Sequence, residues 1–210
     1  MSYLIIVRLM DKMKMREITS NQIFTTKANT LNFLKYNLKK SKIEKLVIFT
    51  ISDWKKNEDE EIKKIQHEFC PNKIVIRSSA QGEDSFHSSL AGKYLSILEV
   101  DSNSKNKIRK AVNSVINSYD DKNTQNQILI QKQTTDVISS GVIFTHQPEF
   151  LAPYYIINYE LGESTTSVTG GITDNVIKLF RGNKINEIPK EWKKLIIAVK
   201  ELNKFQKIFF

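Results

Sequence analysis

The sequence predicts an α+β (mixed α/β) fold arranged in two lobes. The chain has 210 residues, of which 40% are hydrophobic and 26% charged, which is sufficient to bury a substantial core. Over residues 22–120, segments with the apolar period of helices alternate with short β-branched runs, whereas residues 121–210 are rich in strand patterns. We therefore place a lobe boundary near residue 120 and treat residues 1–21 as an N-terminal extension.

The first lobe begins with a helix and continues with alternating strands and helices. Apolar residues recur at helical spacing over 23–40, and Thr25 and Thr26 supply hydroxyl groups suited to a helix N-cap, so we predict a helix from about Lys27. The further elements predicted here are a strand at 45–51, an amphipathic helix ending near Phe69, strands at 73–77 and 94–100, and a helix at 104–119. A long polar loop of small residues at 78–92 separates the two later strands.

The second lobe is predicted to contain mainly strands. Apolar and β-branched runs indicate strands at 127–131, 140–145, 154–159 and 175–180. Turns between them are expected at Pro148, Pro153 and Gly170–Gly171. Pro189 opens a final helix that runs almost to Phe210, because proline is favoured in the first turn of a helix.

Composition excludes several classes of protein. Cys70 is the single cysteine, which excludes an internal disulfide framework and a four-cysteine zinc site and favours a reducing, cytoplasmic location. The apolar run Tyr3–Val7 is far shorter than the roughly 20 residues of a membrane helix, so no membrane partner is expected. The net charge of +9 raises nucleic-acid binding as an alternative function. It is the least favoured one, because no interleaving of aromatic and basic residues accompanies the charge.

The stretch from Ile74 to Tyr94 carries the most chemical information. A strand ends at Arg77, whose rigid guanidinium can hold two phosphate oxygens at once, and a run of small residues follows it. Serine, alanine and glycine allow backbone N–H groups to approach an anion closely. The residues alone leave two interpretations open: a polyphosphate site, or an ordinary strand followed by a solvated loop.

This stretch resembles the nucleotide-binding part of the phosphoenolpyruvate synthase and pyruvate phosphate dikinase family. The family pattern V-R-S-S-A-x-x-E-D, followed after a short gap by S-F-A-G, is similar to Ile76–Ala80, Glu83–Asp84 and Ser89–Gly92. Further similar segments follow in the family order: Gln131, Ser140–Thr145 with Pro148, Glu160–Glu163 and Val168–Gly170. Upstream, Lys27–Leu31 resembles the family segment G-G-K-x-x-x-L, so the resemblance spans about residues 22 to 205.

The resemblance implies an ATP-grasp-like fold that binds ATP together with Mg²⁺. It implies that Lys27 and Arg77 contact the ATP phosphates. It also implies that Gly92 and Ser96 lie in the loop that closes over the phosphates, and that Gln131 lies beside the adenine. Without the family, Lys27 and Gln131 would be interpreted as surface residues and Ser96 as an ordinary strand residue.

The sequence departs from the family pattern at three places. Thr25–Thr26 stand where the family usually has two glycines before its lysine. The chain stops at Phe210, before the family strands that carry the metal-binding glutamate and close the nucleotide site, so we expect a fold truncated before those strands and assign no metal ligand. The family passes phosphate through a histidine in a G-G-x-x-S/T-H context, which none of His67, His87 and His146 matches; His87, in the polar loop, is the one we retain as a candidate.

The resemblance therefore implies the ATP-binding portion of a dikinase-like phosphotransferase. In this family, ATP phosphorylates a histidine on a separate domain, which passes the phosphate to pyruvate or another small acceptor. The expected partners are ATP, a small-molecule phosphate acceptor, and the missing C-terminal domains or another chain. Whether this chain is an enzyme by itself stays open, and the alternative is a non-catalytic domain that binds a nucleotide without turnover.

Overall fold

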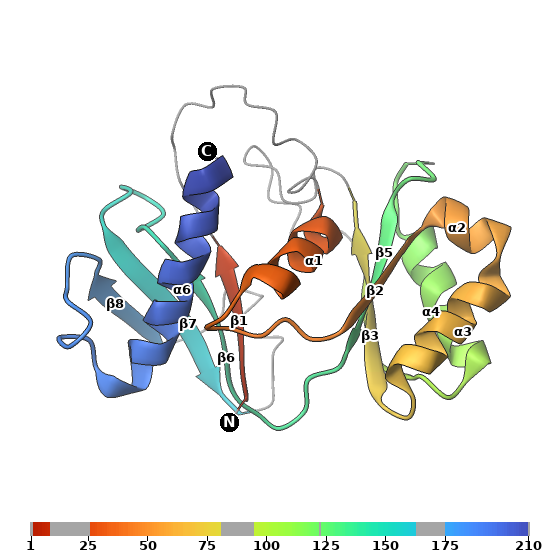
Figure 1. The fold of residues 1–210 in the computed structure, drawn as a ribbon, viewed down its shortest axis with the longest axis horizontal. Coiled ribbons are helices and arrows are strands. Elements are labelled where there is room, and N and C mark those ends of the chain that lie inside the picture. The colour runs from red at the N-terminus through yellow and green to blue at the C-terminus, as the bar shows by residue number, and fades with distance from the viewer. Residues whose placement is uncertain (1, 9–25, 81–94, 122, 163–174, 210) are drawn as a thin grey trace. The chain divides into compact units, whose positions relative to one another are not determined.

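The computed structural model describes residues 2–8, 26–80, 95–121, 123–162 and 175–209 (Figure 1). The chain divides into two compact units, which we call the central unit (Thr19–Gln133) and the terminal unit (Met1–Ile18 with Thr134–Phe210). Each unit contains a four-stranded sheet with helical cover, which confirms the predicted α+β fold. No helix within the described ranges is long and apolar enough to cross a membrane.

The sheet of the central unit is antiparallel throughout. Its strands, in spatial order, are β2 (Leu46–Thr50), β5 (Gln127–Lys132), β3 (Lys73–Ser79) and β4 (Ser96–Asp101). The sequence patterns predict a lobe boundary near residue 120, which would put β5 in the second lobe. The two units divide instead after Gln133, because β5 pairs on both of its edges with strands of the central unit.

One face of this sheet is covered by three helices, α2 (Ile51–Lys56), α3 (Glu58–Phe69) and α4 (Lys105–Asn117) (Figure 1). Ile74 and Ile76 of β3 and Ile128 and Ile130 of β5 are fully buried against them. Alternate residues of a strand point to the same face, so these isoleucines define the core side of the sheet. The residues between them point to the opposite face, which α1 (Lys27–Asn37) contacts at β5 (Figure 1).

The amphipathic stretch that ends at Phe69 was predicted as one helix and forms two. The break is at Asn57, whose φ of −152° and ψ of 65° end α2 and precede α3. The helix α2 begins at a capping box, in which the Thr50 hydroxyl accepts from the Asp53 N–H at 3.1 Å while the Thr50 N–H donates to the Asp53 carboxylate at 2.9 Å. The backbone turn at Asn57 thus divides the stretch into two helices.

The capping box makes stability depend on pH in the acid range. Hydrogen bonds from the Thr50 backbone and hydroxyl hold the pKa of Asp53 below its ordinary value of 3.8. Because the folded-state pKa is lowered, the carboxylate stabilises the fold above pH 3.8 and loses this effect as pH falls through the folded-state pKa. We expect Asp53→Asn to unfold in less urea than the native chain at about pH 7, with a smaller difference at about pH 3. An equal difference at both pH values would contradict this role.

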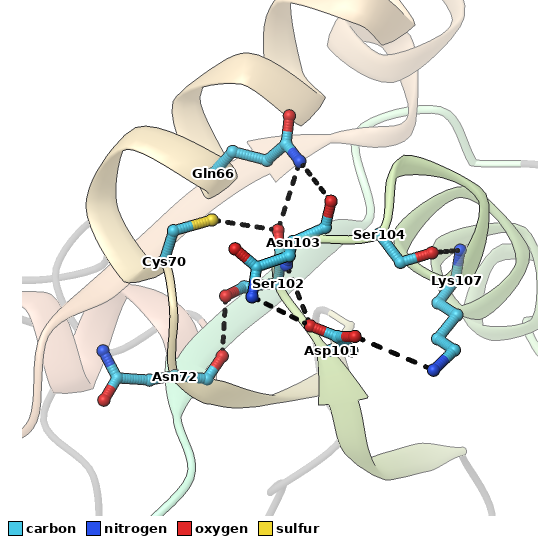
Figure 2. Close-up of polar contacts among 8 residues, drawn as sticks. All are labelled: Gln66, Cys70, Asn72, Asp101, Ser102, Asn103, Ser104 and Lys107. Atoms are coloured by element: carbon cyan, nitrogen blue, oxygen red, sulfur yellow. Dashed lines mark hydrogen bonds and ion pairs between the residues drawn. The ribbon is translucent and has the colours of Figure 1, made fainter.

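A polar cluster ties the turn between β4 and α4 to the end of α3 (Figure 2). Ser102 is fully buried in this turn, and its hydroxyl donates to the Asn72 carbonyl at 2.6 Å. Its own carbonyl accepts from the Cys70 thiol at 3.2 Å and from the Gln66 amide at 3.3 Å. Cys70 therefore takes part in a structural contact between two connecting segments.

Replacing Ser102 by alanine should lower the free energy of unfolding. The change removes the hydrogen bond to Asn72 and leaves a carbonyl without that donor inside the cluster. The expected loss is about 1–3 kcal/mol, measured by urea unfolding. Replacing the exposed Lys107, whose Nζ lies 3.8 Å from Asp101 Oδ2 in the same cluster, should lower the free energy of unfolding much less. An equal loss in both variants would contradict the role of the Ser102 hydrogen bond.

The terminal unit contains a mixed sheet covered by one long helix. Its strands, in spatial order, are β1 (Ser2–Arg8), β6 (Val137–Phe144), β7 (Tyr154–Leu161) and β8 (Val176–Phe180), and only the β1–β6 pair is parallel among those described. The helix α6 (Lys190–Phe209) packs Ile196 and Val199 against Ile143 and Ile157 of the sheet. The sequence predicts residues 1–21 to be an extension, whereas residues 2–8 form an edge strand of this sheet.

Candidate functional site

Three of the residues predicted to bind ATP lie on one face of the central sheet. Arg77 of β3 is the direct cross-strand partner of Ser96 of β4. Val75, two residues before Arg77, is the direct partner of Gln131 of β5. Cross-strand partners share a face, as do residues two apart on one strand. Arg77, Ser96 and Gln131 therefore lie together on the face opposite to α2, α3 and α4.

These side chains differ in exposure. Arg77 and Gln131 are half-buried, whereas Ser96 is exposed. Leu129, the partner of Arg77 on β5, is fully buried on the same face. A guanidinium keeps its positive charge in proteins, and its interaction with an anion is stronger beside buried apolar surface than in bulk water. This face therefore combines a partly buried cation with a hydroxyl and an amide.

The first turn of α1 lies at one end of the same face. Lys27 is the first residue of this helix. The turn is hydrogen-bonded to Ser79 and Gln127, which are direct cross-strand partners of each other. Ser79 lies two residues after Arg77, and so on the same face of the sheet. The structure thus brings the helix start that carries Lys27 to the strands that carry Arg77 and Gln131.

The contacts that hold this turn form what we call the first-turn network. Thr26 is the N-cap, as predicted, and its hydroxyl accepts from the Asn29 N–H at 3.1 Å and donates to Gln127 Oε1 at 2.6 Å. The Ala28 N–H donates to the Ser79 hydroxyl at 2.8 Å. The Gln127 amide nitrogen donates to Asn29 Oδ1 at 3.1 Å. Every member of the network thus bridges α1 to the sheet or caps the helix.

The network determines how this helix start can meet an anion. The first N–H groups of a helix have no partner within the helix and are the usual donors to a bound phosphate. Here the N–H groups of Ala28 and Asn29 already donate to side-chain oxygens. An anion at this place would therefore be met by side chains such as Lys27 and Arg77 in preference to those two amides.

Thr26, which stands where the resemblance implies a glycine, is compatible with this backbone. Thr26 has φ −142° and ψ 159°, an extended conformation that any residue adopts, so glycine is not needed there. Its hydroxyl supplies the cap and the bond to Gln127, neither of which glycine could supply. Thr25 lies outside the described residues.

Other candidates from the sequence are not part of this face or lie outside the described residues. Gly92, His87 and the Glu83–Asp84 pair belong to 81–94, which the structure does not describe. His67 lies on α3, the opposite side of the central sheet, where it lines a shallow cavity of about 510 Å³. His146 contacts Arg181 in the terminal unit. Among the described residues, no group of three or more histidine, cysteine or acidic side chains could hold a metal ion.

Sequence reasoning missed Gln127 and assigned no site to Ser79 or Tyr119. The Tyr119 hydroxyl accepts from the Ser79 N–H at 2.9 Å and donates to the Gln127 carbonyl. The serines after Arg77 were valued only for their small size, although a hydroxyl at a strand end is a recognisable hydrogen-bonding group. No local pattern marks Gln127, because its partner Thr26 is 101 residues away in the sequence.

Comparison with known proteins identifies the family. A family model described as pyruvate phosphate dikinase, AMP/ATP-binding domain, matches residues 5–204. The motifs indicate a resemblance from about residue 22, and the match extends the family region upstream to include most of β1. No curated protein matches the chain. Because the match covers nearly all of its 210 residues, the chain belongs to the family of pyruvate phosphate dikinase AMP/ATP-binding domains.

Proposed function

We propose that this chain is the ATP-binding portion of a dikinase-like phosphotransferase, and that ATP binds on the α1 side of the central sheet. The observation that carries the proposal is the register that brings Arg77 onto one face with Ser96 and Gln131. The first turn of α1, with Lys27, is fixed at one end of that face. Membership of an AMP/ATP-binding domain family supports an adenine nucleotide as the ligand.

The donor set of this face fits ATP. The Arg77 guanidinium offers paired N–H groups and the Lys27 ammonium offers a compact charge, and both suit phosphate oxygens. The Gln131 amide presents a donor beside an acceptor, which matches the edge of adenine that carries N6 and N7. The Ser96 hydroxyl can both donate and accept, next to Arg77.

The order of these residues along the sheet suggests an orientation for the nucleotide. Along β5, Gln127 lies at the α1 end of the face, Leu129 lies opposite Arg77, and Gln131 lies furthest from α1. Gln127 and Gln131 are four residues apart, roughly 13 Å along an extended strand, which is comparable with the length of an extended nucleoside triphosphate. We therefore place the phosphates toward α1 and Arg77 and the adenine toward Gln131.

The chemical role proposed for these residues is to bind and orient the triphosphate. Phosphoryl transfer depends mainly on positioning and on neutralising the charge of the phosphate oxygens, which Lys27 at the α1 end of the face and Arg77 at its centre would provide. Mg²⁺ enters the proposal as the ion that would accompany ATP and would offset part of the negative charge of its phosphates. We assign it no protein ligand, since the described residues include no group of three or more histidine, cysteine or acidic side chains able to hold it.

The phosphate acceptor is proposed to be a histidine on another domain or chain. From this histidine the phosphate would pass to pyruvate or another small molecule. The alternative is a nucleotide-binding domain without turnover, and the positions of the described histidines fit both candidates equally. Neither of the described histidines, His67 on α3 and His146 in the terminal unit, lies on the face of the central sheet that carries Arg77.

Calorimetric titration with ATP and with GTP, each with and without Mg²⁺, tests the proposed function. Saturable binding that prefers ATP would support both the site and the adenine position at Gln131. Release of ADP or AMP and phosphate from bound ATP would favour the phosphotransferase. Because the acceptor histidine is proposed to lie outside this chain, binding without any product is expected of both candidates. A folded chain that binds neither nucleotide would contradict the proposal.

A further inference from the structure

We infer that Ser79 and Gln127 are positioning residues for ATP binding, which hold the first turn of α1, and with it Lys27, against the face that carries Arg77. This inference rests on the proposed function, since it concerns the same site. It concerns two residues that contact the helix backbone and its cap, and it assigns neither of them a contact with ATP. Their effect on the nucleotide would pass through Lys27.

Few residues of α1 are fully buried. The helix has 11 residues, all of them described, and Ala28 is the one among them that is buried. Helices of this length are marginal by themselves, and most are held in proteins by an apolar face packed on the core. Leu31, Phe33 and Leu34 are half-buried, so the polar contacts at the first turn add to limited apolar packing in fixing the place of α1 on the sheet.

Ser79 is rigidly held and contacts the helix directly. Its side chain is fully buried, and its hydroxyl accepts from the Ala28 N–H at 2.8 Å. Its own N–H donates to the Tyr119 hydroxyl at 2.9 Å, and that hydroxyl donates to the carbonyl of Gln127. Tyr119, which follows the C-terminus of α4, therefore joins the two strand ends that contact α1, at Ser79 of β3 and Gln127 of β5.

Gln127 holds the helix through both ends of its amide. Its oxygen accepts from the Thr26 hydroxyl at 2.6 Å, and its nitrogen donates to Asn29 Oδ1 at 3.1 Å. Together with the bond between Ala28 and Ser79, three hydrogen bonds join the first turn of α1 to the strand ends. Lys27 lies between Thr26 and Ala28 in the chain, so both of its neighbours are bonded to the sheet.

The test compares Ser79→Ala with Ser102→Ala, which is a matched control. Both serines are fully buried in the central unit, and both hydroxyls make one hydrogen bond to a backbone group, at 2.8 Å for Ser79 and 2.6 Å for Ser102. We expect Ser79→Ala to raise the Kd for ATP about fivefold and Ser102→Ala to leave it within about 1.5-fold, with similar losses of stability. Equal changes of Kd in the two variants would overturn the inference.

A double-mutant cycle distinguishes positioning from a general structural effect. If Ser79 acts through Lys27, Ser79→Ala should have no further effect on the Kd for ATP in a Lys27→Met background. The same fivefold change in both backgrounds, or a Lys27→Met variant that binds ATP like the native chain, would overturn the inference. Amide hydrogen exchange supplies a readout without nucleotide, in which Ser79→Ala should raise the exchange rate at Ala28 and Ser102→Ala should not.

A second pair of variants keeps the test independent of Ser79. Thr26→Val removes the hydroxyl that caps α1 and bonds Gln127, whereas Thr26→Ser retains it. We expect Thr26→Val to weaken ATP binding and Thr26→Ser to restore it, and failure of the serine to restore binding would count against the network.

If the native chain bound no ATP, the proposed function would fail and this inference with it. Binding that depends on Arg77 but is unaffected by Ser79→Ala and Thr26→Val would overturn the positioning role alone.

Discussion

Replacing Arg77 by methionine should raise the Kd for ATP by about 100-fold, because a hydrogen bond to a charged group contributes about 1.5–3 kcal/mol and a guanidinium can make two. Methionine retains an apolar stem of similar length, so the half-buried position on β3 stays filled. The Kd of Arg77→Lys should lie between those of the native chain and Arg77→Met, about tenfold above the native value, because lysine keeps the charge but lacks the planar pair of donors. Calorimetric titration at one fixed salt concentration measures all three proteins.

Two controls accompany the Arg77 variants. Urea unfolding shows whether each variant folds, because a lost fold would also abolish binding. Ser102→Ala lowers stability at a place remote from the α1 side of the sheet, and so shows how much affinity changes with stability alone. A folded Arg77→Met protein with the native Kd would remove Arg77 from the site and leave the face without its central cation.

The same titrations test the proposed orientation of the nucleotide. Gln131→Leu should lower the preference for ATP over GTP, because the amide is proposed to recognise the adenine edge. Arg77→Met should weaken both nucleotides equally, because they carry the same triphosphate. A loss of base preference in Arg77→Met would place the base near Arg77 and reverse the orientation.

Local patterns in the sequence predicted the elements that carry the candidate site. The cap at Thr26 and the helix that begins at Lys27 are both present, and so is the strand through Arg77, which extends two residues further to Ser79. These features depend on neighbours in the chain: a hydroxyl before a helix, or β-branched residues in a row. The family match also confirms the resemblance that was inferred from motifs at these positions.

Long-range pairing was not predictable in the same way. The run Tyr3–Val7 was recognised only as too short for a membrane, yet it pairs with β6, more than 130 residues away. β5 follows a change to strand-rich sequence but inserts between β2 and β3. Gln127 lies in no recognisable sequence motif, and its side chain contacts the start of α1, 101 residues earlier in the chain. Periodicity indicates which face of a strand is apolar but not which strand lies beside it.

The sequence motif Ser140–Thr145 contains a glycine whose role is structural. Gly141 lies in β6 between two strands, where it pairs with Ile5 of β1 and Tyr159 of β7. A Cβ atom at Gly141 would lie 2.5 Å from the Asn158 carbonyl oxygen and 3.1 Å from the Tyr159 Cβ. The first of these is a backbone atom of a paired strand, so the contact cannot be relieved by rotating a side chain.

We expect Gly141→Ala to lower the free energy of unfolding by about 2–3 kcal/mol, the upper part of the range for an overpacked interior. Where space is available, the same change stabilises a protein by limiting the unfolded chain, so the sign of the effect tests the close approach directly. Moving β7 would also disturb the edge contact of Tyr159 with Trp192 of α6, whose ring centroids are 4.9 Å apart. Urea unfolding measures the change, with Ile138→Thr at an exposed position of β6 expected within about 0.5 kcal/mol of the native chain. A Gly141→Ala protein as stable as the native chain would show that β6 and β7 are further apart than the structure places them.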